Sequence, residues 1–241
     1  MRRVLVTRPE PGATRTAGRL SQLGFEPLVL PLSATKPLAV DGAVVPDDAA
    51  AVAVTSANAL RHAPPELIGR LAALACHAVG ERTAAAAQAA GFRAVEAGPG
   101  DAAGLAEAIA PQLAGKRLVY LCGRERLPLF EDRLAEVGVR ITAIETYDTV
   151  AVEPPDATAL SLLGGRPVDA VLLYSVRAAE AAARLVRHTA LMPVLANAAV
   201  FSLSARIDAA FRVAGGDCKG ARHVATTPDE EALMALLQAK G

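Results

Sequence analysis

Short apolar runs alternate with amphipathic helical patterns along this chain. Residues 4–7 form an apolar run with β-branched members, and apolar positions then recur at helical spacing over residues 16–24, where a glycine ends the pattern. This order predicts a strand, a loop and a helix. Residues 25–32 are predicted as the next strand, because Pro27 and Pro31 bracket an apolar run that a helix interior would not tolerate.

The same order of elements returns later in the chain, which indicates an internal repeat. Three pairs of segments correspond: residues 4–7 with 118–121, 52–57 with 171–176, and 78–84 with 200–205. Short strands that alternate with helices predict parallel sheets covered on both faces, and two copies predict two such sheets. We therefore expect an α/β fold with two parallel-sheet domains.

The connectivity of the two domains stays open at this point. Proline-containing extended stretches occupy residues 31–46 and 145–155 and have the composition of linkers or of a small ladder. The domains either follow one another with a break near Gly115, or the chain leaves the first domain near Pro31, builds the second and returns near Pro155. Sequence spacing alone does not choose between these arrangements.

Composition narrows the class of function. With 241 residues, of which 52% are hydrophobic and 21% charged, the chain can form one large or two small folded domains. Its 25 basic and 25 acidic side chains give a formal net charge of +0, which disfavours a nucleic-acid partner because such binding depends on a basic field. Aromatic residues are only 3%, so few stacking platforms exist for bases or flat cofactors.

Cysteine usage and the length of apolar stretches predict a cytoplasmic protein. Cys76, Cys122 and Cys218 form no paired pattern, so we expect reduced thiols rather than a disulfide framework. No uncharged apolar stretch reaches the roughly 20 residues that cross a bilayer, and the first residues lack the apolar core of a signal peptide. We expect neither export nor membrane insertion.

Polar and cationic residues gather at the predicted carboxyl ends of the strands, where parallel α/β sheets bind ligands. The loops there are residues 7–9, 55–58, 80–83, 123–126, 174–177 and 202–204. Nearly all offer hydroxyl, amide or guanidinium groups, which suit a ligand with many carboxylates or phosphates. Serine, threonine and asparagine are also the usual N-caps of helices, so each loop has a purely structural explanation as well.

Motifs for several common chemistries are missing or degenerate. The sequence has no Gly-x-x-x-x-Gly-Lys-Ser/Thr phosphate loop and no Gly-x-Ser-x-Gly nucleophile elbow. Residues 98–103 fit a degenerate dinucleotide fingerprint, but Pro99 lies inside the turn and no acidic residue follows at the required distance. The 4 histidines lack ligand spacing, so we expect no metal site.

Six short motifs, taken together, connect the chain to a known family. They are Val6-Thr7-Arg8-Pro9, Thr55-Ser56-Ala57-Asn58-Ala59, Val79-Gly80-Glu81-Arg82-Thr83-Ala84, Tyr120-Leu121-Cys122-Gly123-Arg124, Glu145-Thr146-Tyr147-Asp148-Thr149 and Tyr174-Ser175. In this order and spacing, the chain resembles the uroporphyrinogen-III synthase family over essentially its whole length. Residues 201–205 depart from the family pattern, because they lack the Gly-x-x-Thr-Ala form common in the second copy.

The resemblance implies a fold class with defined boundaries. It implies two flavodoxin-like parallel-sheet domains joined by a two-stranded β-ladder hinge, with a cleft between them. The first domain would be residues 1–32 plus 156–241, and the second would be residues 44–142. Residues 33–43 and 143–155 would form the linker ladder. The resemblance thereby favours the arrangement in which one domain is inserted into the other.

The resemblance also implies a reaction that uses no cofactor and no metal. The family cyclises a linear tetrapyrrole with multiple carboxylates, hydroxymethylbilane, to uroporphyrinogen III, with loss of water and inversion of the last pyrrole ring. Tyr147 is the implied catalytic residue, because its phenol can donate a proton or a hydrogen bond to the leaving hydroxyl. The implied substrate contacts are Thr7, Arg8, Thr55, Ser56, Thr83, Ser175 and Ser204. We expect a hydro-lyase that acts as a monomer.

Two other functions fit the same pattern. A non-enzymatic bilobed binding module would close on a small anionic metabolite, since fold alone does not decide function. A nucleotide-sugar transferase with two similar lobes would bind a nucleotide through residues 98–103. Diversion of hydroxymethylbilane to the inverted ring isomer separates the first of these from the enzyme, and nucleotide binding separates the second.

Overall fold

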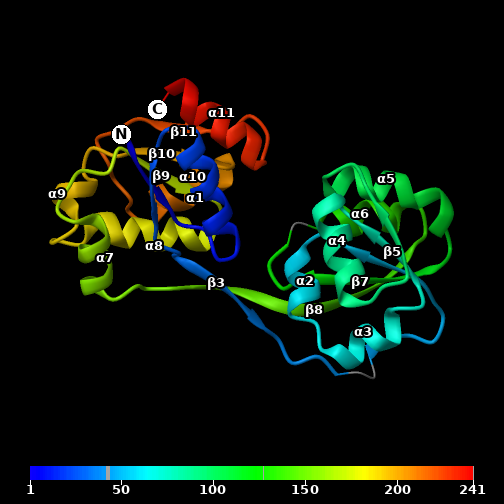
Figure 1. The fold of residues 1–241 in the computed structure, drawn as a ribbon. Coiled ribbons are helices and arrows are strands. Elements are labelled where there is room, and N and C mark those ends of the chain that lie inside the picture. Colours follow the sequence, from blue (N-terminus) through cyan, green and yellow to red (C-terminus); the bar gives the residue numbers. More distant parts are fainter. Residues whose placement is uncertain (42–43, 127, 241) are drawn as a thin grey trace. The chain divides into compact units, whose positions relative to one another are not determined.

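The computed structural model describes residues 1–41, 44–126 and 128–240, and the chain divides into two units. Unit 1 combines both ends of the chain, Met1–Ala34 and Val150–Gly241, whereas unit 2 is the single segment Thr35–Thr149 (Figure 1). Of the expected ladder, residues 42–43 lie outside the described residues.

Unit 1 contains a five-stranded parallel sheet with helices on both faces. Its elements are β1 (Arg3–Val6), α1 (Gly12–Gln22), β2 (Glu26–Val29), α7 (Asp156–Leu163), β9 (Ala170–Leu173), α8 (Val176–Arg187), α9 (Met192–Leu195), β10 (Ala199–Ser202), α10 (Ala205–Val213), β11 (Arg222–Val224) and α11 (Glu230–Lys240). The strands lie in the order β11-β10-β9-β1-β2, and every pair is parallel. This order is the flavodoxin-like arrangement.

Unit 2 contains a six-stranded sheet in which five strands are parallel. Its elements are β3 (Ser33–Pro37), β4 (Ala49–Val54), α2 (Ala57–Arg61), α3 (Pro65–Leu71), β5 (Ala75–Ala78), α4 (Glu81–Ala90), β6 (Ala94–Ala97), α5 (Ala102–Leu113), β7 (Arg117–Gly123), α6 (Leu129–Glu136) and β8 (Arg140–Ala151). The strands lie in the order β3-β8-β7-β4-β5-β6, and all pairs from β8 to β6 are parallel. The predicted α/β class with two parallel sheets is confirmed.

Equivalent strands have the same neighbours in both sheets, but they follow one another in a different order along the chain. The segments that the repeat pairs in sequence occupy equivalent places, with β1 matching β7, β9 matching β4, and β10 matching β5. Apart from β3, which has no counterpart in unit 1, unit 2 therefore begins with the strand that is third in unit 1 and ends with the two strands that come first there.

The edge strand β3 runs antiparallel to β8. The N–H of Leu38 bonds to the carbonyl of Thr146, and the N–H of Val152 bonds to the carbonyl of Leu32. Partner numbers fall as the numbers of β3 rise, which defines the antiparallel direction. The chain passes from unit 1 into unit 2 through β3 and returns through β8, and residues 143–149, expected in a linker, are part of unit 2.

Element boundaries differ from the predicted ones at several ends. α1 begins at Gly12, one turn before the predicted start. The strand predicted over residues 25–32 is shorter, Glu26–Val29, although the N–H groups of Leu30 and Leu32 still bond to the carbonyls of Val6 and Thr7. The hydrogen bonds to β1 thus continue past the end of the regular strand.

Side chains of each strand alternate between two buried faces. In unit 1, Leu5 and Val171 belong to the core under α7, α8 and α10, whereas Val4 and Leu172 belong to the core under α1 and α11. Unit 2 has α2, α3 and α4 over one face and α5 and α6 over the other. Because both faces are covered, accessible polar groups are concentrated at the strand ends.

Arg3 joins the two chain segments that build unit 1. Its side chain is 6% exposed. Its guanidinium donates to the backbone carbonyls of Leu163, the last residue of α7, and Arg166, and to Oε1 of Glu26 in β2. Its N–H donates to Oδ2 of Asp169 at 2.7 Å. A buried cation with this many acceptors stabilises the fold only while the whole set is present.

We predict that Arg3→Met destabilises the protein by about 3 kcal/mol, because it leaves buried backbone carbonyls without their guanidinium donor and takes one of two arginine partners from Glu26. Denaturant unfolding measures the change. Arg2→Met is the matched control, since Arg2 is exposed and the same substitution there is expected to stay within about 0.5 kcal/mol. Equal losses for both variants would contradict the role of Arg3.

Candidate active site

The carboxyl ends of parallel strands share one edge of a sheet, and ligands bind outside that edge where neighbouring strands connect in opposite directions. In unit 1 this place lies beyond β1 and β9, which lead into residues 7–8 and 174–175. In unit 2 the equivalent strands are β7 and β4, which lead into Arg124 and residues 55–56. Each unit thus has its own candidate set.

Arg8 is held among three side chains at the edge of unit 1. Its guanidinium carbon lies 4.6 Å from the centroid of the Tyr174 ring, and its Nη1 lies 3.0 Å from Oε2 of Glu230 and 3.3 Å from Oγ1 of Thr16. The Thr16 hydroxyl donates to Oε1 of Glu230 at 2.5 Å. The Arg8 side chain keeps 19% of its surface exposed, so a cation in a fixed geometry faces solvent at the strand end.

Glu230 comes from the charged first turn of α11, the element farthest along the chain from Arg8. Burial alone would raise the pKa of Glu230, but the hydrogen bond from Thr16 and the charges of Arg8 and Arg19 outweigh it and hold the pKa below the usual 4.5. The carboxylate is therefore ionised at neutral pH, and Arg8 keeps a charged partner.

All three predicted serine contacts are N-cap residues of helices. The Oγ of Ser56 accepts from the N–H of Asn58 at 3.2 Å, and the Oγ of Ser175 accepts from the N–H of Ala178 at 3.1 Å. Ser204 is the N-cap of α10 but its side chain makes no capping bond. All three are partly exposed. The first two therefore act as ordinary caps, whereas α10 has no side-chain cap at its N-terminus.

Two predicted contacts are buried. Thr7 is 0% exposed, and its hydroxyl donates to the carbonyl of Leu172 at 2.6 Å, which ties β1 to β9. Thr83 lies in the first turn of α4 and is 4% exposed. A hydroxyl next to a strand end has the same sequence pattern whether it faces the core or solvent, so the sequence did not distinguish these two from Thr55, which is partly exposed.

Tyr147 lies across the end of β7. A Cβ on Gly123 would be 2.6 Å from Cζ of Tyr147, so the ring occupies the space that a side chain at Gly123 would need. The His62 ring centroid is 5.9 Å from that of Tyr147, and Nε2 of His62 is 2.8 Å from Oγ1 of Thr35. Tyr147 is thereby brought together with groups from three other strands or loops of unit 2.

Tyr147, Tyr120 and His62 are uncharged at pH 7. Burial raises the pKa of Tyr147, and a hydrogen bond with Ser56 only partly offsets this. Burial also raises the pKa of Tyr120 to about 12, and its hydroxyl lies 2.7 Å from Oγ1 of Thr55. Burial lowers the pKa of His62, aided by a neighbouring arginine. This edge of unit 2 offers neutral hydrogen-bonding groups rather than a strong acid.

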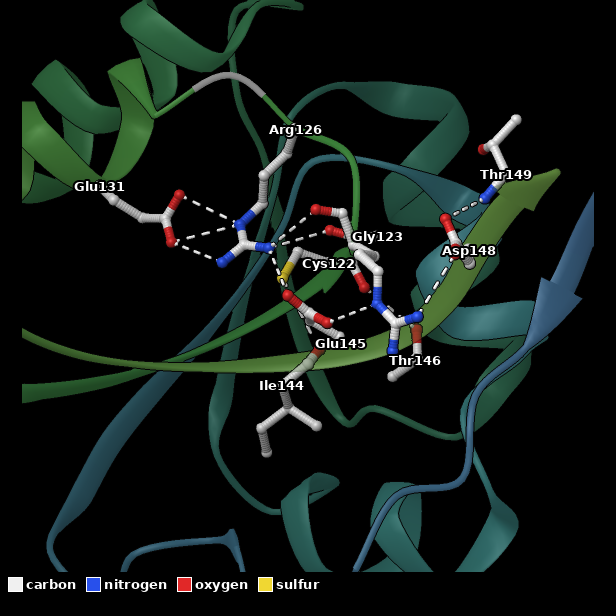
Figure 2. A network of polar contacts seen from close by, with 10 residues as sticks. Cys122, Gly123, Arg126, Glu131, Ile144, Glu145, Thr146, Asp148 and Thr149 are labelled. Atoms are coloured by element: carbon white, nitrogen blue, oxygen red, sulfur yellow. Dashed lines mark hydrogen bonds and ion pairs between the residues drawn. The ribbon is translucent and has the colours of Figure 1, made fainter. Parts of the chain in front are cut away.

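Two arginines and three carboxylates form a network at the end of β7 and the middle of β8 (Figure 2). Arg126 binds both oxygens of Glu131 and donates through Nη1 to Oε1 of Glu145 at 3.0 Å. Arg124 lies 3.2 Å from the other Glu145 oxygen and 3.4 Å from Oδ2 of Asp148. The hydrogen bond from Arg126 holds the pKa of Glu145 below its usual value. Arg124, with 56% of its side chain exposed, is the cation that this network presents to solvent.

Close backbone packing explains why positions 98 and 100 are glycines. The N–H of Gly98 donates to the carbonyl of Ala78 at 2.8 Å, and that of Gly100 donates to the carbonyl of Val79 at 2.7 Å. A Cβ on Gly98 would lie 3.1 Å from the Ala78 oxygen. Glycine therefore lets this loop pack against the end of β5, and its presence gives no argument for a nucleotide.

The part of the chain that the structure describes holds neither a cysteine nucleophile nor a cluster of metal ligands. Cys76, Cys122 and Cys218 are buried free thiols, and burial raises the pKa of each to about 11 or 12, so none is a thiolate nucleophile. Within residues 1–41, 44–126 and 128–240, no group of three or more His, Cys, Asp or Glu side chains has metal-binding geometry. Among the helices described, none has the length and apolar character needed to cross a membrane.

Comparison with known proteins identifies the family. The family model described as "Uroporphyrinogen-III synthase HemD" matches residues 14–235. The chain belongs to the uroporphyrinogen-III synthase family. The match runs through both units and includes five of the six motifs in full, from Thr55-Ser56 to Tyr174-Ser175. The resemblance inferred from those motifs is confirmed, and no comparison supports the non-enzymatic alternative.

Solved uroporphyrinogen-III synthases share the fold. The enzyme from Helicobacter pylori 26695 is 18% identical with a TM-score of 0.66, and the alignment covers 99% of each chain. A mutant enzyme from the extremely thermophilic bacterium Thermus thermophilus is 23% identical with a TM-score of 0.52, covering 99% of this chain and 97% of that one. No curated protein matches the sequence significantly.

The family motifs contain a supporting residue of the candidate site that the sequence reasoning passed over. Tyr120 opens one of the quoted motifs, and the register of β7 with β4 places it opposite Ala53, two positions before Thr55. That pairing is readable only once the two strands are known to be neighbours. Glu230 and His62 gave no such signal, since each acts through partners distant in sequence.

We predict that Glu230→Gln lowers the free energy of unfolding by about 1 kcal/mol near pH 7, because it removes the charged partner of Arg8. A depressed carboxylate pKa adds stability above the unfolded value, and that stability is lost as the pH falls through the folded value. The difference between wild type and variant should therefore shrink as the pH falls below 4.5.

Denaturant unfolding at a series of pH values measures this difference. Glu231→Gln is the matched control, because Glu231 is 80% exposed and pairs with Arg19 at the surface, where ion pairs contribute about 0 to 1 kcal/mol. A wild-type advantage over Glu230→Gln that stays constant down to about pH 3 would contradict a depressed Glu230 pKa.

Proposed function

We propose that this protein is a hydro-lyase that converts hydroxymethylbilane to uroporphyrinogen III, with loss of water and inversion of the last pyrrole ring. The observation that carries the proposal is the family match over residues 14–235. In the family that the chain resembles, this reaction uses no cofactor, and the arrangement of neutral donors and fixed cations in each unit suits such a reaction.

The proposed substrate carries many carboxylates, and each unit offers groups that bind them. Unit 1 has Arg8 and the N-terminus of α10, which starts at Ser204 without a side-chain cap. Unit 2 has Arg124 and the N-terminus of α4, where the N-cap is Gly80. Guanidinium groups and helix N-termini both stabilise carboxylates. Direct contacts are proposed for Arg8, Thr55, Ser56, Ser175 and Ser204, and the buried Thr7 and Thr83 are assigned supporting roles.

We assign Tyr147 the task of helping the substrate hydroxyl leave. Its raised pKa keeps the phenol protonated at neutral pH, so it donates a hydrogen bond to the departing oxygen rather than acting as a strong acid. The remaining tasks are to shield the electron-poor intermediate from water and to orient one ring carbon for attack. Binding geometry supplies orientation.

The proposal is tested with purified protein and hydroxymethylbilane. Spontaneous closure gives the symmetric ring isomer, so the fraction of inverted isomer after chromatography measures enzymatic ring closure. Added protein is expected to divert most of the product to the inverted isomer. A product distribution identical to that of a protein-free control would reject the proposed function.

We predict that Tyr147→Phe lowers kcat by about 10- to 100-fold, the effect of losing one hydrogen bond to a developing charge. This loss should exceed that of any other single substitution among the proposed contacts. Initial rates of formation of the inverted isomer, at saturating substrate, provide the measurement.

Tyr120→Phe is the matched control, because it also removes one phenol oxygen, from β7, the strand next to β8. Because that hydroxyl is buried and bonded to Thr55, we expect this control to change thermal stability more than rate. A Tyr147→Phe protein that unfolds at the wild-type temperature and keeps the full rate would remove Tyr147 from the mechanism.

A further inference from the structure

The pairing of β7 with β8 contains a register shift at Thr146. Cys122 pairs with Glu145, and the next residue of β7, Gly123, pairs with Tyr147, so Thr146 has no partner across the ladder. This is a β-bulge, with one extra residue on β8. Bulges are rare between parallel strands and re-aim side chains where they occur.

The bulge determines which face of the sheet carries Tyr147. Before it, side chains of β8 alternate: Ala143 packs on the α5 and α6 side, and Ile144 packs on the α2 and α3 side. Continued alternation would put Tyr147 on the α6 side with Glu145. Instead, Thr146 and Tyr147 both face α2, where Thr146 bonds to Ala59 and Tyr147 packs against that core.

Thr146 is tethered on both sides of the bulge. Its hydroxyl is fully buried and donates to the carbonyl of Ala59 in α2 at 2.8 Å, with the carbonyl of Cys122 at 3.5 Å as a second acceptor. Its own carbonyl accepts the N–H of Leu38, next to β3, at 2.9 Å. These bonds fix the extra residue between an edge strand and a helix.

The residues that flank Thr146 are held as well. Glu145 points to the opposite side, where Arg124 and Arg126 bind its two oxygens (Figure 2). Tyr147 closes over Gly123, and its carbonyl accepts the N–H of Arg124 at 2.9 Å. The bulge is thus anchored at three successive residues of β8.

We propose that Thr146 is a positioning residue for the proposed ring closure: its buried hydroxyl holds the bulge that turns the Tyr147 phenol to the face of Ser56 and His62. The proposal rests on the proposed function for its kinetic consequence. Its structural consequence, the placement of the phenol, is measurable without any activity. The Thr146 side chain itself is buried and contacts no substrate.

The kinetic test uses Thr146→Val, which keeps the shape and removes the hydroxyl, and Thr146→Ser, which keeps the hydroxyl. Thr146→Val is expected to lower kcat by about 10-fold while KM changes by less than about 2-fold, since a transition-state interaction is lost. Thr146→Ser should recover most of the rate. In a Tyr147→Phe background, Thr146→Val should change kcat by less than about 2-fold, because the group it positions is gone.

Equal effects of Thr146→Val in both backgrounds would overturn the proposal, as would a change confined to KM. Gly123→Ala is a second variant that reaches the same ring from β7, since its Cβ would displace Tyr147. It should reproduce the kcat loss of Thr146→Val and should also have little effect when Tyr147 is Phe. Full activity of Gly123→Ala would contradict the placement.

Ultraviolet titration of the phenols is the readout that does not depend on activity. Subtracting the titration curve of a Tyr147→Phe variant from that of the same protein with Tyr147 isolates the Tyr147 phenol. Its pKa should move toward the ordinary value for tyrosine in Thr146→Val and should stay unchanged in Thr146→Ser. An unshifted Tyr147 in folded Thr146→Val would overturn the positioning role. If the wild-type protein forms only the symmetric isomer, the proposed function fails, while this titration still decides the placement of the phenol.

Discussion

Unit 1 depends on the insertion of β1 between β2 and β9, which pairs segments that lie far apart in the chain. The Thr7 hydroxyl donates to the carbonyl of Leu172, 165 positions later. The Arg3 guanidinium donates to groups in β2 and in the segment that precedes β9. This pairing puts Arg8 against Tyr174 at the point where neighbouring strands connect in opposite directions. The pairing thereby positions two proposed contacts of unit 1, Arg8 after β1 and Ser175 after β9.

The two units share one strand order but present different chemistry. In unit 1 the edge carries an ion pair, Arg8 with Glu230, beside a partly buried tyrosine. In unit 2 the corresponding edge carries the neutral phenol of Tyr147 near a neutral His62, with the charged network to one side. The strand β2, which matches β8, pairs with β1 in unbroken register. That regular pairing ends at Val6 and Val29, before the positions of unit 1 that correspond to the bulge.

The hydrophobic pattern predicted most of the fold, because strands buried on both faces appear in the sequence as short apolar runs. The internal repeat then made it possible to align these runs between the two halves. The register shift at Thr146 was not predictable, since one extra residue in β8 changes no apolar spacing. Burial of Thr7 was hidden for a related reason: the residue type at a strand end does not reveal the direction of its side chain. Glu230 was missed because its partner Arg8 lies more than 200 positions away, and no local pattern connects them.

The interruption of unit 1 by unit 2 has a consequence for the nascent polypeptide. The ribosome releases β1, α1 and β2 first, then the whole of Thr35–Thr149, and only afterwards β9, β10 and β11. Unit 2 is contiguous and has all its strands before unit 1 has its third. Until β9 emerges, the edge of β1 that pairs with it has no partner strand. The N-terminal segment is therefore the part of the new chain most in need of chaperone protection.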